Sequence, residues 1–422
     1  MRVDLLIHSA SQLLTLAGGP QPGERLGQLG LIEDGAVAID GERIAAVGPS
    51  RQLIASLDPA ATLDADGQLV MPGFIDPHTH LVWAGDRAHE FEQRIAGVPY
   101  LEILKQGGGI LHTVERTRQA SLEQLVIAGR DRLRRMLALG TTTVEAKTGY
   151  GLDTETELRM LQAILRLDDE GPWDLAPTLL AGHAVPAEFS GDPDGYVEMV
   201  VNQMLPAVDA WWAEHAGGRS LPFVDVFCEE GAFDLAQSER LLRAAAELGF
   251  PLKVHADEFE ALGGSSLAAR LGAVSVDHLV ATTETDMQAL AQSETVAVSL
   301  PATPFGLGLA AYTPARRLLA AGATLALATD LNPGTAPGES MQLVLALACR
   351  QLKLTPAEAI AAATINAAAA IGLAADRGSL EVGKLADLLV LQVSDYRQLG
   401  YRFGGNLVRQ VYKRGQLVVD RT

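Results

Sequence analysis

Short apolar runs that end in polar residues, each followed by a polar or amphipathic stretch, recur through the middle of the chain. Eight such runs lie at residues 70–80, 141–147, 175–183, 223–229, 252–255, 273–278, 296–300 and 325–330. Segments with helical spacing follow most of them, as at residues 155–167, 237–248 and 264–271. Alternating strands and helices imply parallel strand pairing, so eight units predict an α/β fold, a (β/α)8 barrel over residues 70–374.

The two ends of the chain show a different pattern. Residues 1–69 hold short β-branched runs separated by turns with glycine and aspartate, and residues 375–422 repeat that character. Neither end has enough strands to cover a core alone. We therefore expect both ends to join in one small β-sandwich beside the barrel. The alanine-rich stretch 359–375 is expected to form a buried helix.

Composition and charge narrow the function classes. With 33 basic and 52 acidic residues the net charge is −19, which argues against nucleic acid and anionic membrane partners. Two cysteines are too few for a disulfide framework, and the first residues lack the apolar run of a signal peptide. These features predict a cytoplasmic protein without membrane segments, and symmetry statistics favour a homodimer.

Polar residues able to bind a metal or move protons end six of the eight runs. They are His80, Lys147, His183, His255, His278 and Asp330. Strand carboxyl ends and the loops after them build the active site in barrels of this type. A hydrophobic core would reject so many polar groups, so their convergence at one rim indicates chemistry rather than packing.

His78 and His80 are the sharpest local signal. Side chains at positions i and i+2 of a strand share a face, so both imidazoles can hold one cation. An isolated pair of this kind is more often two exposed histidines, but the apolar run before it favours ligands. His255 and Asp330 complete a four-residue site that suits one divalent ion, zinc or iron.

Longer motifs resemble the amidohydrolase superfamily. The resemblance rests on residues 72–80, which read Pro-Gly-Phe-Ile-Asp-Pro-His-Thr-His, and on residues 378–387. A narrower resemblance, to the imidazolonepropionase family within it, rests on residues 100–110 with their triple glycine, 147–152, 182–186, 255–258, 273–279 and 328–335. Family members often carry cysteine or serine where this chain has Leu331 and Thr148, neither of which is a proposed ligand.

The resemblance implies hydrolytic opening of the 4-imidazolone-5-propanoate ring to N-formimidoyl-L-glutamate in histidine catabolism. It assigns proton transfer to Glu258 and Asp330 and polarisation of the carbonyl to His278. Related barrels with two metals bridge them by a carboxylated lysine on the fourth strand. Here Lys147 lies on the second strand, so an ion pair of Lys147 with Glu145 or a neighbouring residue is expected, together with a single metal.

The substrate is then a small molecule with a carboxylate tail, which needs a local cation in so acidic a chain. Its expected contacts are Arg87, Tyr150, His183, Glu258, Asn332, Gly334 and Thr335. Arg87 would bind the carboxylate through two hydrogen bonds, and Tyr150 would offer a hydroxyl.

Two alternatives use the same sequence features. Another single-metal amidohydrolase, such as a deaminase of cyclic amidines, would keep the ligands, and only Arg87, Tyr150 and residues 332–335 argue against it. A non-catalytic barrel scaffold would be expected to lose ligands that this chain retains. Turnover of imidazolone propanoate and a stoichiometric metal distinguish the three.

Overall fold

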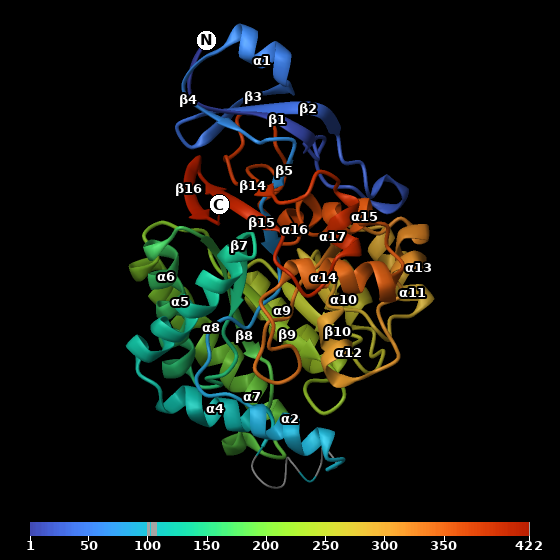
Figure 1. Cartoon of the computed structure of the whole chain (residues 1–422). Coiled ribbons are helices and arrows are strands. Elements are labelled where there is room, and N and C mark those ends of the chain that lie inside the picture. Colours follow the sequence, from blue (N-terminus) through green and yellow to red (C-terminus); the bar gives the residue numbers. More distant parts are fainter. Residues whose placement is uncertain (99–101, 103–107, 422) are drawn as a thin grey trace.

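The computed structural model describes residues 1–98, 102 and 108–421. A barrel forms the larger part of the molecule, and a small sheet lies at one of its ends, with both chain termini in the sheet (Figure 1). Helices α2 (Ala88–Ile95) and α4 (Ile110–Gln119) lie at the opposite end of the barrel.

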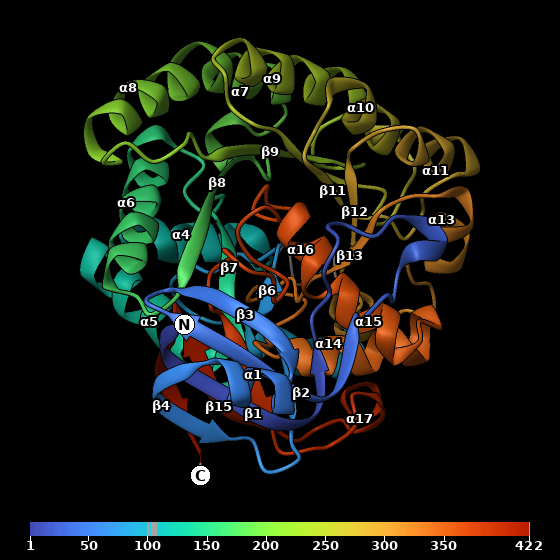
Figure 2. The ribbon, with the colours of Figure 1, turned by 90° about the horizontal axis from the view of Figure 1, so that it is seen from above.

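Eight parallel strands form the barrel within the described residues. In chain order they are β6 (Phe74–Asp76), β7 (Thr141–Lys147), β8 (Asp174–Gly182), β9 (Phe223–Cys228), β10 (Lys253–Ala256), β11 (Ser275–His278), β12 (Val296–Ser299) and β13 (Leu325–Leu327). Each pairs with the next, and helices surround the ring of strands (Figure 2). The predicted (β/α)8 fold is confirmed.

The barrel closes between its first and last strands at the ends that carry the candidate ligands. Thr79 and Leu331 form a parallel bridge just beyond β6 and β13. The amide of His80 donates to the carbonyl of Leu331 (2.9 Å), and that of Asp330 donates to the carbonyl of His78 (3.1 Å). Closure therefore brings residues 78–80 and 330–331 together.

The first predicted strand, residues 70–80, is wrong in its extent. It divides at Gly73 into β5 (Leu69–Pro72), which pairs with β14 (Leu388–Leu391) of the small sheet, and β6, which pairs with β7. A Cβ at Gly73 would lie 2.4 Å from Thr142 Oγ1, so only glycine lets the chain pass so close to β7.

Strands from both ends of the chain share the small sheet. Its other members are β1 (Arg2–Leu14), β2 (Leu31–Asp40), β3 (Arg43–Pro49), β4 (Asp58–Asp64), β15 (Val408–Lys413) and β16 (Gln416–Asp420). The order is β16-β15-β14-β5-β1-β2-β3, and β4 pairs with β1 in parallel. Because β5 leads directly into β6, the sheet is anchored to the start of the barrel.

Capping residues begin several of the helices that cover the barrel. The longer ones are α5 (Leu122–Ala138), α6 (Thr154–Glu170), α8 (Leu205–His215), α9 (Leu235–Glu247), α10 (Gly264–Leu271) and α11 (Glu284–Ala291). The shorter ones are α7 (Pro193–Met199), α12 (Ala302–Leu307), α13 (Ala315–Ala321), α14 (Met341–Leu347), α15 (Pro356–Ala362) and α16 (Ile365–Ala369). Two further helices lie elsewhere: α1 (Ser50–Ser56) packs on β1, β2 and β3 of the small sheet, and α17 (Arg397–Tyr401) packs on α14 and α15. Ser121 and Gln124 form a reciprocal capping box at the start of α5, as Asp234 and Gln237 do for α9.

The single helix expected over residues 359–375 is wrong. The segment holds the end of α15 and all of α16, separated at Thr364, whose φ of −131° and ψ of −91° are not helical. Its hydroxyl donates to the carbonyl of Ile360, which serves the end of α15 instead of continuing the helix. Most of the motif at 100–110 lies outside the described residues. Across the described part of the chain, every helix is too short or too polar to cross a membrane.

Candidate metal and substrate site

A cavity of about 400 Å3 opens at the carboxyl ends of the barrel strands. Predicted site residues line much of it: His80, Arg87, Tyr150, His183, His255, Glu258, His278, Asp330, Asn332 and Thr335. His78 is fully buried and lies beneath the wall, and Gly334 lines an adjoining cavity that also contains Arg87. The barrel thus gathers the predicted residues from distant segments at one end.

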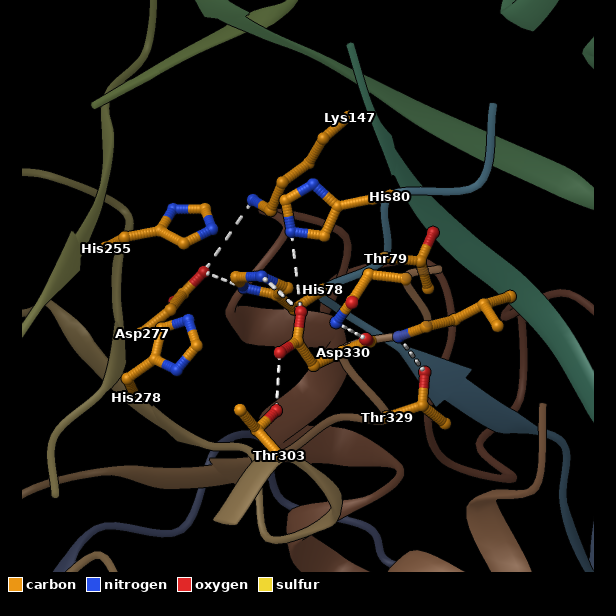
Figure 3. Close-up of polar contacts among 12 residues, drawn as sticks. His78, Thr79, His80, Lys147, His255, Asp277, His278, Thr303, Thr329 and Asp330 are labelled. Carbon is orange, nitrogen blue, oxygen red and sulfur yellow. Dashed lines mark hydrogen bonds and ion pairs between the residues drawn. The ribbon is translucent and has the colours of Figure 1, made fainter. Parts of the chain in front are cut away.

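The four predicted metal ligands form one compact cluster (Figure 3). Ligand atoms of His78, His80 and His255 lie within 4.8 Å of one another, as do those of His78, His278 and Asp330. Asp330 Oδ1 lies 3.4 Å from the Nε2 atoms of both His78 and His80. His278, predicted to act on the substrate, is therefore also close enough to serve as a ligand.

Buried polar atoms without hydrogen-bond partners mark the centre of this cluster. Among the described residues they include His78 Nε2, both ring nitrogens of His255 and Asp330 Oδ1. A buried polar atom without a partner costs about 1–3 kcal/mol, so a fold that keeps several side by side needs a ligand for them. Nitrogen lone pairs and one carboxylate oxygen form the donor set that zinc or ferrous iron takes.

Two carboxylates lie behind the histidines. Asp277 Oδ2 is 2.6 Å from His78 Nδ1, and Asp225 Oδ2 is 3.0 Å from His255 Nδ1. An imidazole that donates from Nδ1 presents its Nε2 lone pair on the other side, where the cluster lies. Lys147 Nζ contacts Asp225 Oδ2 at 2.8 Å and Glu145 Oε1 at 2.7 Å, so the expected ion pair with Glu145 is present.

Asp330 is held by its own neighbours. Its second carboxylate oxygen accepts from the hydroxyl of Thr303, and its carbonyl accepts from Asn332 Nδ2 at 2.7 Å. The preceding Thr329 donates its amide (3.1 Å) and hydroxyl to Asp76. Burial raises the pKa of Asp76 to about 7 in spite of these bonds. The carboxylate that faces the histidines is thus fixed from both sides.

The backbone at the site adopts left-handed conformations that side chains other than glycine seldom take. Asp257, His278, Leu279 and Asp330 have φ values of 55°, 86°, 61° and 55°. Each such residue costs free energy, and it persists only where surrounding contacts enforce it. These residues end β11 or follow β10, β11 and β13, and two of them, His278 and Asp330, line the cavity.

Glu258 and His278 lie next to each other in the wall of the cavity. Glu258 Oε2 lies 3.6 Å from His278 Nδ1. Burial, and then the charges of Asp330 and Glu229, raise the pKa of Glu258 well above its usual range. Burial lowers the pKa of His278 to about 4. A carboxyl group that holds its proton at higher pH is suited to pass one between substrate atoms.

Arg87 is held by a carboxylate, with the rest of its guanidinium next to the cavity. Its Nε donates to Glu90 Oε2 at 2.8 Å, and the other oxygen of Glu90 accepts from the amide of Gly109 at 3.0 Å. A Cβ at Gly334 would lie 2.3 Å from Arg87 Nη1, so a side chain there would displace the guanidinium from its present position. Arg94, on α2, lines the same cavity and donates to the carbonyl of Gly334 at 3.1 Å.

Asn332 holds the loop that it starts. Its side-chain oxygen accepts from the amides of Gly334 and Thr335, both at 2.8 Å, and its Nδ2 also donates to Thr335 Oγ1 at 2.9 Å. These bonds occupy the amide group within the chain. Its role as a substrate contact stays a prediction, while its structural role is to shape residues 332–335.

Tyr150 and His183 form the wall beside His80. The rings of His80 and His183 stack with centroids 4.9 Å apart, and Tyr150 lies 5.2 Å from His183. His183 Nδ1 lies 3.0 Å from the carbonyl of Gly149, and burial lowers the pKa of His183 to about 3. A neutral ring that donates from Nδ1 presents an acceptor nitrogen on its other side.

Several residues of the site escaped the sequence analysis. They are Glu90, Arg94, Asp225, Asp277, Phe227 and Thr303. A usable signal existed for Asp225, a charged residue inside the apolar run 223–228, because a buried charge needs a partner. Nothing comparable distinguished Arg94 from an ordinary helical arginine.

Comparison with known protein families shows the family to which the chain belongs. The model of the amidohydrolase family matches residues 69–418, which include the whole barrel and most of the returning strands. The chain therefore belongs to the amidohydrolase family.

Its close relatives identify the branch of that family. An imidazolonepropionase of Herpetosiphon aurantiacus is 52% identical over 415 residues, which cover 98% of this chain and 97% of that protein. One of Chloroflexus aggregans is 53% identical over 420 residues, covering 99% and 98%. Within the family, the chain belongs to the imidazolonepropionases.

Solved structures share the fold at low sequence identity. A zinc-bound adenosine deaminase of Xanthomonas campestris superposes with a TM-score of 0.72 at 22% identity, covering 99% of this chain and 93% of that one. A 5-methylcytosine deaminase of Klebsiella pneumoniae gives 0.73 at 17%, covering 99% and 98%. At these identities the likeness establishes the fold alone.

Proposed function

We propose that this chain hydrolyses 4-imidazolone-5-propanoate to N-formimidoyl-L-glutamate, a step of histidine breakdown. The relationship to imidazolonepropionases over nearly the full chain carries this proposal. The cavity agrees with it, because it combines a cluster of metal-binding groups, a buried acid and an arginine.

His78, His80, His255 and Asp330 are the residues proposed to hold one divalent ion, zinc or iron, and His278 faces the same point. The unpartnered atoms of His78, His255 and Asp330 support this assignment. Such an ion supplies a water of lowered pKa and polarises a carbonyl bound beside it.

In the proposed reaction, the bond between the ring carbonyl carbon and its adjacent nitrogen breaks. The carbon keeps the oxygen of a water molecule and becomes a carboxylate, and the nitrogen gains a proton. Glu258 is placed to take that proton from the water and deliver it to the nitrogen. Asp330 can share the transfer, and His278 can donate a hydrogen bond to the oxygen that becomes negative.

Arg87 is the residue proposed to bind the propanoate tail. Its fixed Nε leaves the terminal nitrogens for a carboxylate, and Arg94 adds a second positive charge nearby. Tyr150, His183, Asn332, Gly334 and Thr335 would complete the contacts with substrate or product. A cytoplasmic homodimer remains part of the proposal, tested by cell fractionation and by light scattering of the purified protein.

The decisive experiment combines elemental analysis with turnover of imidazolone propanoate. We expect about one zinc or iron per chain and release of N-formimidoyl-L-glutamate, with guanine, adenosine and cytosine left unchanged. Release of ammonia from one of these bases, without turnover of imidazolone propanoate, would replace the proposal with a deaminase.

A further inference from the structure

We propose that Lys147 is a positioning residue that sets two of the metal-binding imidazoles by acting through the carboxylates of Asp225 and Asp277. The inference rests on the proposed function, because it concerns how the ligands of that site are held. It gives a task to a buried cation that the reaction itself leaves unused.

The geometry links Lys147 to both histidines through single oxygen atoms. Lys147 Nζ lies 2.8 Å from Asp225 Oδ2 and 3.8 Å from Asp277 Oδ2. Those same oxygens lie 3.0 Å from His255 Nδ1 and 2.6 Å from His78 Nδ1. The ammonium thus lies behind two carboxylates, and each carboxylate lies behind one imidazole. Figure 3 shows one of these two series, from Lys147 through Asp277 to His78.

Because this arrangement is buried, the electrostatic interactions within it are strong. Lys147, Asp225 and Asp277 side chains are all 0% exposed, so water cannot screen the two negative charges from each other. The ammonium of Lys147 offsets the repulsion between the two carboxylates, and the ammonium of Lys253, 3.7 Å from Asp277 Oδ2, adds to this effect at Asp277. His78 Nδ1 donates to Asp277, which leaves the Nε2 lone pair of His78 for the metal. His255 Nδ1 lies 3.0 Å from Asp225 Oδ2, so this carboxylate attracts the Nδ1 side of the ring and Nε2 faces the cluster.

A third contact of Lys147, through Glu145, acts on the backbone between His78 and His80. Glu145 accepts from Lys147 Nζ at 2.7 Å through one oxygen, and its other oxygen accepts from the amide of Thr79 at 3.1 Å. Thr79 lies between His78 and His80, so the same lysine also fixes the backbone that carries them. Lys253 does not share this position, since it contacts only Asp277 among the three carboxylates, at 3.7 Å, and otherwise the carbonyls of Pro77 and Ala370.

The test is the metal affinity of Lys147→Met, which keeps the length of the side chain and removes its charge. Apoprotein is titrated with Zn2+ against a chromophoric chelator, and the visible spectrum of the Co2+ form reports the ligand geometry. Loss of an outer partner of metal ligands lowers affinity about 10–100-fold. We expect a loss in that range and a changed Co2+ spectrum.

The chain offers a matched control in Lys413. Its side chain is 3% exposed and contacts two carboxylates, Asp174 and Asp387, each at 2.6 Å, at the junction of barrel and sheet. Lys413→Met should lower the melting temperature while Zn2+ affinity and the Co2+ spectrum stay unchanged. Lys147→Arg, which keeps the charge, should recover part of the lost affinity and serves as the second variant if Lys147→Met does not fold.

Three outcomes would overturn a claim. Wild-type affinity and spectrum in Lys147→Met would overturn the inference alone. Equal losses of metal affinity in Lys147→Met and Lys413→Met would do the same, because general destabilisation would then explain both. Wild-type protein that binds no stoichiometric metal would overturn the proposed function and this inference with it.

Discussion

Two buried polar clusters lie at opposite ends of the barrel, and they differ in how completely their polar atoms are hydrogen-bonded. At the cavity end, His78 Nε2, His255 Nε2 and Asp330 Oδ1 have no hydrogen-bond partner. At the end that meets the small sheet, every oxygen of Asp174 and Asp387 is paired, with Lys413 contacting both carboxylates.

The second cluster joins parts of the chain that are distant in sequence. Asp174 begins β8 of the barrel and contacts Lys413 at the end of β15, together with Arg377 and Arg414. Burial would raise the pKa of Asp174, but the charges of Lys413 and Arg377 overcome it and lower the pKa to about 2. This cluster contributes to stability because its charges compensate one another.

The difference shows what each cluster is for. Buried carboxylates whose oxygens are all paired have no acceptor left for a ligand, whereas the cavity cluster keeps its acceptor atoms unpaired at a cost in stability. Variants at the cavity should therefore change metal binding, turnover or substrate affinity, and variants at the junction should change stability alone. Four predictions test this division, from the largest expected effect to the smallest.

His255→Ala should abolish both stoichiometric metal and turnover, because it removes a nitrogen ligand from the cluster. Elemental analysis and the hydrolysis assay check it. His215→Ala is the control, since His215 is an exposed histidine at the end of α8 and should keep both properties. A His255→Ala variant with full metal content would remove His255 from the ligand set.

Glu258→Gln should keep its metal and slow turnover by about 10²–10⁴-fold, the usual contribution of a positioned acid or base. Steady-state kinetics on metal-loaded protein measure this change. Glu260→Gln alters an exposed carboxylate on the same loop and should leave kcat as it is. If Glu258→Gln turned over at the wild-type rate, the proton transfer would belong to another residue.

Arg87→Ala should raise KM for imidazolone propanoate by roughly 10–100-fold, since a charged hydrogen bond contributes about 1.5–3 kcal/mol. Metal content should not change. Arg87→Lys keeps the charge without the two-pronged geometry and should fall between wild type and Arg87→Ala. An unchanged KM in Arg87→Ala would refute its assigned role.

Asp174→Asn should lower the free energy of unfolding by about 1–2 kcal/mol at pH 7 without affecting metal or turnover. Its folded pKa, about 2, lies below the unfolded value of about 3.9, so the stabilisation is present above pH 4. It is lost as pH falls from about 4 towards 2. Melting temperatures of wild type and variant should therefore converge on acidification.

The exposed pair of Glu284 and Arg317 provides the contrast for this last prediction. Glu284→Gln should give no measurable change in melting temperature, because exposed ion pairs are screened by water and salt. A pH-independent difference between Asp174→Asn and wild type would show that packing, and not charge, causes the loss.

Much of the barrel could be predicted because its signals are local. Strands such as β7 follow from apolar runs, and the proposed ligands His255 and Asp330 follow from their place at or just after a strand. The division at Gly73 could not be predicted, since the need for glycine arises from the approach of Thr142 on another strand.

The carboxylates that contact the proposed histidine ligands could not be predicted from the sequence either, because these contacts also join different strands. Asp277 is adjacent to His278 in sequence but serves His78, almost 200 residues away, and only the closed barrel brings them together. The resemblance to imidazolonepropionases implies that Asn332 contacts the substrate. The structure adds that its side chain is already engaged in shaping its own loop.

The bridge between Thr79 and Leu331 sets the order in which this site can come into being. A chain that emerges from the ribosome presents His78 and His80 early, but their carboxylate neighbour Asp330 is synthesised some 250 residues later. Until Asp330 has been synthesised, the two imidazoles lack the carboxylate that lies beside them in the folded chain. The carboxylate of the cluster is thereby added only when the last barrel strand meets the first, so a truncated product that lacks this strand would keep the imidazoles without Asp330.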